Sequence, residues 1–244
     1  KELPDKLEKV IYSVMEGPQK KLYQASVQRL KDSLEKQTEE EFKTGKLQIL
    51  AELTRLRQIC CDPSMAYENF HGQSAKTEAC LELVRTAAAV GNKVLLFSQF
   101  TTALDIIQKR LEKEKIGCFL LTGSTAKEKR AELVEQFNHD DTPVFLISLK
   151  AGGTGLNLTA ASVVIHFDPW WNMAAQNQAT DRAHRIGQKQ VVTVYKLIVK
   201  DTLEEKILKL QEMKAQLSDE IISEGSIKSA LATREELMEI LQPL

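Results

Sequence analysis

Short apolar runs alternate with longer helical patterns in the central part of the chain, and this alternation restricts the fold more than any other feature. The runs are mostly continuous instead of alternating with polar residues, which is typical of strands covered on both faces of a parallel sheet. They occupy residues 93–98, 118–121, 144–148, 163–167 and 192–198. Helical patterns lie at residues 76–90, 101–114, 125–138 and 173–186. The order predicts a three-layer α/β domain with a mostly parallel sheet and right-handed crossovers.

Helical patterns also flank this central part. Residues 1 to about 70 look helical and charged, and one apolar helix face is expected there from Leu47, Leu50, Leu53, Leu56 and Ile59. We expect the polar stretch at 37–46 to be a hinge between two helices and Pro63 to end the second.

A further helix is expected from residue 201. Thr202 and Glu205 have the spacing of a capping box, and Gly225 is suited to end the helix. We expect the helix to pack back on the domain through a stripe made of Leu203, Ile207, Leu210, Leu217 and Ile221.

Composition narrows the class of protein. The net charge of −1 excludes a globally basic nucleic-acid binder but allows a local basic face. The longest apolar runs have strand length, far short of a membrane span, so no membrane partner is expected. The four cysteines lack metal-binding spacing, so we expect reduced thiols and no bound metal, in a cytoplasmic or nuclear protein. Because the first residue is lysine, we expect a piece of a longer protein.

Polar or glycine-rich loops follow four of the strands, at the edge where parallel sheets bind ligands. In the longest loop, at 148–159, Gly152, Gly153 and Gly155 would let backbone amides approach a phosphate or sugar, and Lys150 adds a cation. An ordinary tight turn explains these glycines equally well. In the loop at 168–172, we expect one of two adjacent tryptophans to pack on the core and the other to contact a partner or a nucleic-acid strand.

The loop at 121–125 leads into a helix with a basic first turn. Ser124 or Thr125 can cap that helix, and its free amides could hold a phosphate. Lys127, Lys129 and Arg130 make this end basic, although a solvated helix face is the simpler interpretation.

Two arginines stand three residues apart in "QATDRAHRIGQ" (178–188). On a helix that Gly187 ends, Arg182 and Arg185 would leave from one face and suit a triphosphate. The alternative is a surface ion pair between Asp181 and Arg185, worth about 0.3–0.5 kcal/mol. On a helix that starts near 173, Arg185 would lie about 18 Å along it, away from the strand ends. The arginines would then serve a ligand held between two domains.

Five segments occur in a telling order: "LLFSQF", "LTGSTAKEKR", "ISLKAGGTGLNLT", "VVIHFDPWWN" and "QATDRAHRIGQ". Together they closely resemble the second RecA-like lobe of the Swi/Snf-type ATPases, within helicase superfamily 2. "DRAHRIGQ" is highly specific, because other superfamily-2 helicases carry a differently spaced arginine motif. The resemblance implies a helical protrusion and linker at 1–72, a RecA-like lobe at 73–199, and a brace helix and tail at 200–244. The sequences of these motifs look most like those of the bacterial branch of the family.

The resemblance also implies roles for single residues. Arg182 and Arg185 would be arginine fingers that reach ATP and magnesium held mainly by a first lobe, and Gln178 would help order their helix. Residues near the nucleotide would be Gly153, Gly155 and Asn157. Lys150, where the family often has arginine, and Trp171 would approach the DNA backbone or minor groove. The residues that contact successive phosphates of the DNA strand would be Ser98, Gln99, Gly123, Ser124 and Arg130.

The sequence contains neither GxxxxGK[ST] nor an acidic DExH after a strand, so the magnesium nucleotide has no primary site here. This absence indicates half of a two-lobe motor that is inactive alone. The resemblance implies that the whole ATPase translocates on duplex DNA and remodels protein–DNA complexes. The partners of this half would be the first lobe, duplex DNA and a DNA-bound protein cargo, at the bacterial nucleoid or in a eukaryotic nucleus. Three alternatives stay open: a non-catalytic binding module, a strand-separating helicase and a small-molecule α/β enzyme.

Overall fold

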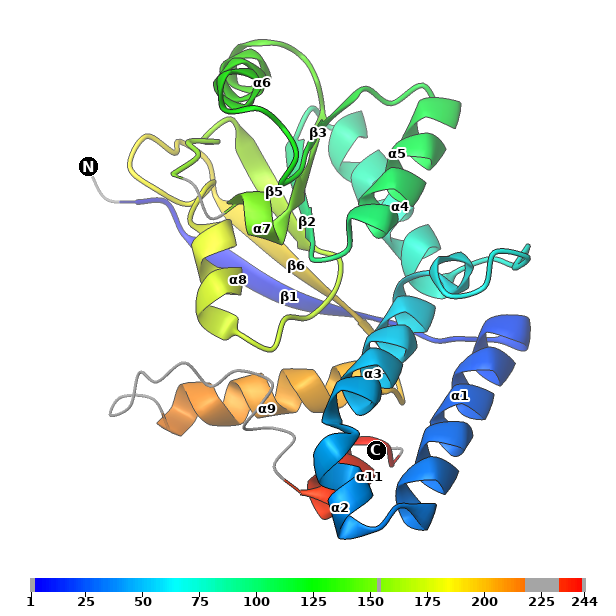
Figure 1. The fold of residues 1–244 in the computed structure, drawn as a ribbon. Helices are drawn as coiled ribbons and strands as arrows, with labels where there is room; N and C mark the ends of the chain where they lie inside the picture. The colour runs from blue at the N-terminus through cyan, green and yellow to red at the C-terminus, as the bar shows by residue number, and fades with distance from the viewer. Residues whose placement is uncertain (1–2, 153–154, 218–232, 243–244) are drawn as a thin grey trace. The chain divides into compact units, whose positions relative to one another are not determined.

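The computed structural model describes residues 3–152, 155–217 and 233–242 (Figure 1). The chain forms two compact units, each made of two segments. A sheet unit consists of Lys1–Tyr12 and Thr77–Ile198, and a helical unit consists of Ser13–Lys76 and Val199–Leu244.

The sheet unit is built on six strands in the order β1-β6-β5-β2-β4-β3. Their bounds are β1 Lys6–Ser13, β2 Lys93–Ser98, β3 Cys118–Leu121, β4 Val144–Ser148, β5 Ala161–His166 and β6 Val192–Val199. The pairs β2–β4, β2–β5, β3–β4 and β5–β6 are parallel. β1 also runs parallel to β6, because Val192 N donates to Asp5 O and Lys200 N to Ser13 O in the same order. The predicted RecA-like, mostly parallel α/β fold is confirmed.

Helices flank the sheet, with α4 and α5 on one side and α6, α7 and α8 on the other (Figure 1). Their bounds are α4 Ala75–Ala89, α5 Thr101–Lys113, α6 Lys127–His139, α7 Leu149–Gly152 and α8 Met173–Thr180. Phe97, Phe137 and Phe145 are buried at the centre of one core, and the last two rings lie 5.2 Å apart. Apart from Lys93 at the start of β2, every residue of β2, β4 and β5 is buried, which explains their nearly continuous apolar sequence.

The expectation of helix throughout the first 70 residues is wrong at its start, where residues 6–13 form the edge strand β1. The first four residues of β1 are exposed and none of the eight is buried, so its side chains form no buried face. Main-chain hydrogen bonds to β6 hold the strand, and side-chain periodicity cannot reveal such bonds.

The helical unit consists of α1 Gly17–Lys36, α2 Glu39–Thr44, α3 Lys46–Cys61, a 3-10 turn at Pro63–Met65, α9 Leu203–Leu217 and α11 Arg234–Ile240. The predicted stripe on α3 is confirmed at Leu53, Leu56 and Ile59, which are buried, but it is wrong at Leu47, which is 81% exposed. Ile49 is buried as well. The predicted hinge at 37–46 contains α2, which begins at a reciprocal capping box between Thr38 and Glu41.

The start of α9 differs from the predicted capping box by one residue. Thr202 Oγ1 accepts from Glu204 N at 3.2 Å, and the Glu205 carboxylate accepts from Asp201 N at 2.6 Å. Leu203 and Ile207 are buried as predicted. The Leu217 side chain, Ile221 and Gly225 lie outside what the structure describes.

A buried ion pair joins two segments of the helical unit that are far apart in sequence. Lys76 Nζ contacts a carboxylate oxygen of Glu204, and neither side chain has exposed surface. The second carboxylate oxygen accepts from Val199 N at 2.9 Å. Burial disfavours the charged form of Lys76, but the Glu204 carboxylate together with Cys61 and Cys60 outweighs it, and the pKa of Lys76 is raised.

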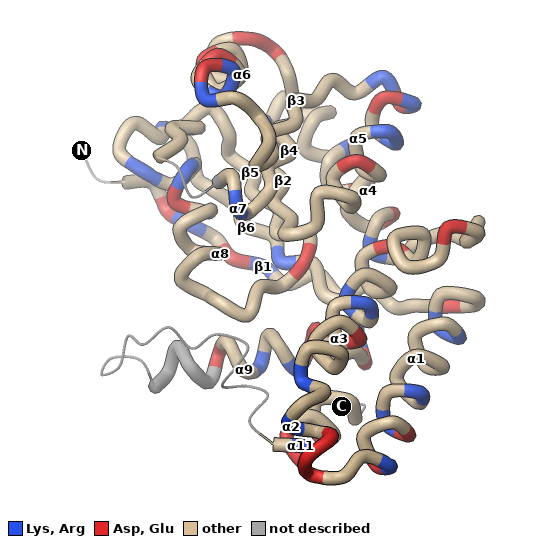
Figure 2. Tube along the Cα trace, in the orientation of Figure 1, with Lys and Arg blue, Asp and Glu red and all other residues tan. Residues whose placement is uncertain are grey.

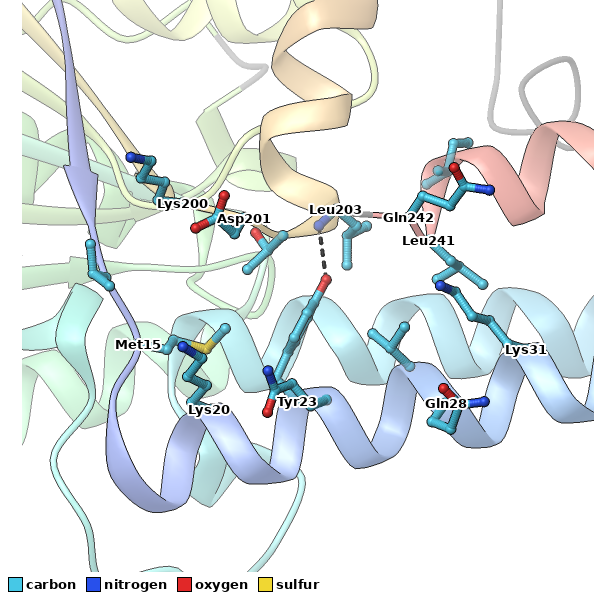
Figure 3. A pocket seen from close by; sticks show the side chains of 15 residues that line it. Met15, Lys20, Tyr23, Gln28, Lys31, Lys200, Asp201, Leu203, Leu241 and Gln242 are labelled. Carbon is cyan, nitrogen blue, oxygen red and sulfur yellow. Dashed lines mark hydrogen bonds between the residues drawn. The ribbon is translucent and has the colours of Figure 1, made fainter. Parts of the chain in front are cut away.

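An open pocket of about 500 Å³ lies in the same unit, between α1, the start of α9 and the end of α11 (Figure 3). Tyr23 crosses its floor, and its hydroxyl accepts a hydrogen bond from Leu203 N at 2.8 Å. Lys20, Lys31 and Lys200 are among its lining residues. Elsewhere, acidic residues lie among the basic ones along α1, α5 and α6 (Figure 2), in keeping with the net charge of −1.

Candidate functional site

The two arginines lie in a turn and not on the predicted helix. α8 ends at Thr180 instead of residue 186, and residues 181–188 form what we call the arginine turn. The backbone tightens there, because Arg182 N and Ala183 N bond to carbonyls only three residues back. Gly187 then adopts a φ of +108°, which favours glycine. The arginines therefore share no helix face, and the 18 Å displacement along a helix does not arise.

Arg182 is a buried cation without a carboxylate contact in the part of the chain that the structure describes. It is 8% exposed, and its Nε has no hydrogen-bond partner there. Burial lowers the pKa of Arg182, the positive charge of Arg185 lowers it further, and Asp181 opposes both. An anion bound beside these guanidinium groups would relieve their repulsion and the cost of burying one of them.

Arg185 is exposed and points back to the glycine-rich loop. Its Nη1 donates to Leu156 O at 3.4 Å, and Leu158 N donates to Arg182 O at 3.0 Å. The described residues contain no ion pair between Asp181 and Arg185, so that alternative is not realised. The structure therefore brings the end of the glycine-rich loop against the arginine turn.

The predicted nucleotide-facing residues are mostly exposed. Gly155 and Asn157 are exposed in the loop, and Gln178 is exposed on α8. A Cβ added at Gly155 would meet nothing within 4 Å, so packing does not require glycine there. Asn138 on α6, which the sequence did not suggest, holds the loop by donating to Asn157 O at 2.8 Å. Gly153 lies outside the described residues.

A polar network joins the ends of β2 and β5. Ser98 Oγ donates to Asp168 Oδ1 at 2.5 Å, and Gln99 N donates to the same oxygen at 3.3 Å. Trp170 Nε1 donates to Gln99 Oε1 at 3.1 Å. The Ser98 side chain has no exposed surface, so this geometry does not support direct contact of its hydroxyl with phosphate. Asp168 was not anticipated, because a carboxylate after a strand reads as an exposed loop residue.

The two tryptophans differ in their surroundings. Trp170 packs against the core and its backbone N donates to the buried Gln176 at 3.3 Å. Trp171 is half-buried, and Lys150 on α7 is exposed.

His166 links the end of β5 to the end of α8. Its Nε2 lies 2.8 Å from Thr180 Oγ1, and its ring stacks on Phe97 with centroids 5.8 Å apart. Burial, followed by the positive charge of Lys196, lowers the pKa of His166 to about 3, so the ring is neutral at pH 7. His166 thus fixes Thr180, the last helical residue before the arginine turn.

The predicted helix cap at Ser124 or Thr125 is wrong. α6 begins after Ala126, which makes no side-chain cap bond. The two hydroxyls instead stabilise their own loop, because Thr125 Oγ1 accepts from Thr122 N and Ser124 Oγ lies 2.8 Å from Thr122 Oγ1. Arg130 closes the loop by donating to Thr125 O and to Gly123 O, at 2.8 and 3.0 Å. Gly123 and Ser124 remain exposed.

The described residues contain no cluster of three or more histidine, cysteine, aspartate or glutamate side chains arranged to hold a metal ion. They also contain no helix with both the length and the apolar character that membrane crossing requires.

Comparison with known proteins decides the family. Residues 75–187 match the helicase conserved C-terminal domain. The chain is 32% identical to the solved C-terminal domain of the Sulfolobus solfataricus SWI2/SNF2 ATPase, with a TM-score of 0.78, covering 97% of this chain and 98% of that one. The chain belongs to the Swi2/Snf2 ATPases. The Swi2/Snf2 ATPase core of the same organism, solved in complex with double-stranded DNA, has 34% identity and a TM-score of 0.82 over 99% of this chain and 51% of that one.

Two curated relatives are much longer than this chain. An uncharacterised ATP-dependent helicase of Mycoplasma pneumoniae is 39% identical over 99% of this chain and 23% of its own length. The putative ATP-dependent helicase/translocase YwqA of Bacillus subtilis is 41% identical over 96% and 26%. The chain thus spans about a quarter of these relatives. Both are bacterial, which fits the expected bacterial branch.

The helicase match ends within the arginine turn of this Swi2/Snf2 domain. It includes both arginines, the strand-end loops and His166, and it stops one residue before Gln188.

Proposed function

We propose that this chain is the C-terminal motor lobe of an ATP-dependent translocase that moves on duplex DNA and remodels protein–DNA complexes. Arg182 and Arg185 would act as arginine fingers on ATP and magnesium held mainly by a first RecA-like lobe. The observation that carries this proposal is the paired guanidinium groups, one of them buried with an Nε that has no partner among the described residues. Such a pair suits the charge that the γ-phosphoryl group gains during transfer to water.

Each arginine would have a defined part in the reaction. Arg185 is exposed, so it can reach a phosphate brought by another lobe without first losing buried contacts. Arg182 is buried, so its guanidinium is already largely removed from water when it meets an oxyanion. Both are attached to residues 156–158 of the glycine-rich loop, so movement of that loop would move the fingers with it.

The same loop would connect ATP to DNA. Lys150 and Trp171 would contact the DNA backbone or minor groove. The residues that contact successive DNA phosphates would be Gln99, Gly123, Ser124 and Arg130. Support comes from the solved Sulfolobus solfataricus relative, which is described as bound to double-stranded DNA. Arg130 donates hydrogen bonds from Nε and one terminal nitrogen to loop carbonyls, so its main role would be to shape the loop that contains Gly123 and Ser124.

The arginine roles are tested in the full-length protein that contains this chain. Arg185→Ala should lower DNA-stimulated ATP hydrolysis by on the order of 10³-fold or more, because an arginine finger stabilises the transition-state charge. Arg85→Ala is the matched control, since this guanidinium on α4 pairs with Glu82 and Glu114 away from the strand-end loops. Wild-type turnover by Arg185→Ala would exclude Arg185 from this role.

Two further measurements separate this function from its alternatives. The isolated chain should hydrolyse no ATP, and robust DNA-stimulated turnover by it would refute the assignment as half a motor. The full-length protein should displace a third strand from a triplex without separating the underlying duplex. Efficient duplex separation would favour a strand-separating helicase instead.

A further inference from the structure

Gln188, the last residue of the arginine turn, uses its whole side chain in hydrogen bonds although it is buried. Its Nε2 donates to Ala161 O at 2.9 Å and to Ala183 O at 3.1 Å. Its Oε1 accepts from Lys189 N at 2.8 Å and from Gln190 N at 2.9 Å. A buried amide is tolerated only with such partners, so the side chain selects one conformation of the turn.

The two carbonyls that Gln188 binds belong to two different parts of the fold. Ala161 is the first residue of β5, so it belongs to the rigid sheet. Ala183 lies between Arg182 and Arg185. One side chain therefore ties the backbone between the two arginines to the sheet.

The other contacts of the arginine turn hold it to loops and not to the sheet. Leu158 N and Leu156 O hold the two arginines, but both belong to the loop before β5 and not to a strand. His184 lies 2.7 Å from Pro4 O, in the segment before β1. His166 on β5 contacts Thr180, one residue before the turn, and so reaches the turn only through the backbone. Among these contacts of residues 181–188, only the Gln188 amide bonds directly to a residue of a central strand.

We propose that Gln188 is a positioning residue for ATP hydrolysis, which sets the place of Arg182 and Arg185 and acts on the reaction only through them. This inference rests on the proposed function of the arginine pair. Catalytic groups must be held to within a fraction of an ångström, and a displacement of about 1 Å can lower the rate by about 10²-fold. A turn released from β5 would tolerate such displacements.

The test uses the full-length protein with Gln188→Met, which keeps the volume of the side chain and removes its hydrogen bonds. The control is Gln190→Met, the same change at an exposed position two residues away. We expect kcat of DNA-stimulated ATP hydrolysis to fall by about 10- to 100-fold in Gln188→Met, with KM for ATP changed by less than about 3-fold. Gln190→Met should stay within about 2-fold of wild type in both parameters. Equal kcat in the two variants would overturn the inference.

A second background distinguishes positioning from a general structural role. If Gln188 acts only through the arginines, adding Gln188→Met to a variant that lacks both of them, Arg182→Ala/Arg185→Ala, should lower the single-turnover rate by less than about 2-fold. A general structural role would lower the rate by the same factor in both backgrounds, and that result would overturn the inference.

The failure of each proposal looks different. Wild-type turnover by Arg185→Ala would remove the proposed function itself. Loss of turnover in Arg185→Ala, with normal turnover in Gln188→Met, would remove only the positioning role. If Gln188→Met does not fold, Gln188→Glu decides, because it keeps the acceptor and loses the two donors. If neither variant folds, Gln188 serves the fold and the inference is overturned.

Discussion

Breaking the buried Lys76–Glu204 pair should strongly destabilise the helical unit. In Glu204→Gln the shape of the side chain is kept, but Lys76, which has no exposed surface, loses the Glu204 carboxylate that pairs with its charge. Because both side chains are fully buried, water does not screen the pair. Removing one partner of such a pair costs about 3–5 kcal/mol, a large fraction of the roughly 5–15 kcal/mol that stabilises a typical domain.

Chemical denaturation of the chain at pH 7, followed by circular dichroism, measures this effect. The control is Glu212→Gln, which removes an exposed carboxylate from the same helix, and it should change the free energy of unfolding by less than about 0.5 kcal/mol. The double variant Lys76→Met/Glu204→Gln should lose less stability than the sum of its two single variants, because it buries no unpaired charge. A loss below about 1 kcal/mol in Glu204→Gln, or strict additivity in the double variant, would refute the reasoning.

The pair also has a predicted pH dependence. The pKa of Lys76 is raised in the folded state, so the folded chain holds this proton more tightly than the unfolded chain does. The stability from the pair is therefore complete below the unfolded value and is lost as pH rises through the raised pKa. Lys76→Met should lack this alkaline component.

Three further predictions concern single side chains. Because the pKa of His166 is lowered from 6.5 to about 3, the unfolded chain takes up this proton first, and stability is lost as pH falls below 6.5. This component should amount to about 2 kcal/mol at pH 5 and should be missing from the unfolding curves of His166→Gln. Thr38→Ala removes the cap of α2 and should lower the free energy of unfolding by about 1 kcal/mol, whereas unchanged denaturation would show that the cap does not contribute. In the full-length protein, Lys150→Ala should reduce the slope of log Kobs for duplex DNA against log salt by about 0.9, and an unaltered slope would exclude a phosphate contact at Lys150.

The bounds of three strands could be predicted closely from the sequence. The strands at 93–98, 118–121 and 144–148 begin and end where their apolar runs do. For β2 and β4 the physical reason is burial on both faces, which favours a continuous run of apolar side chains. β3 is an edge strand that is only partly buried, but its run is apolar as well. Edge strand β1 lacks this burial, and its sequence gives no comparable signal.

The candidate site could be predicted by residue type but not by geometry. Both arginines, the glycine-rich loop and the strand ends were anticipated, and the structure brings the arginines against residues 156–158 of that loop. The surroundings of Ser98 and Ser124 were not anticipated, because each hydroxyl forms a hydrogen bond with a partner specific to this fold or loop. No local pattern states which of several possible partners a hydroxyl will find.

By itself, the sequence determined the layered α/β architecture and the family, because burial periodicity and motif order are written along the chain. Only the tertiary structure decided that the helix stops at Thr180, that Arg182 is buried beside an exposed Arg185, and that Gln188 ties their turn to β5. The reason is that hydrogen bonds between distant segments, such as His166 with Thr180 or Gln188 with Ala161, outweigh the local preference of residues 181–186 for helix. Such bonds exist only after the chain has folded.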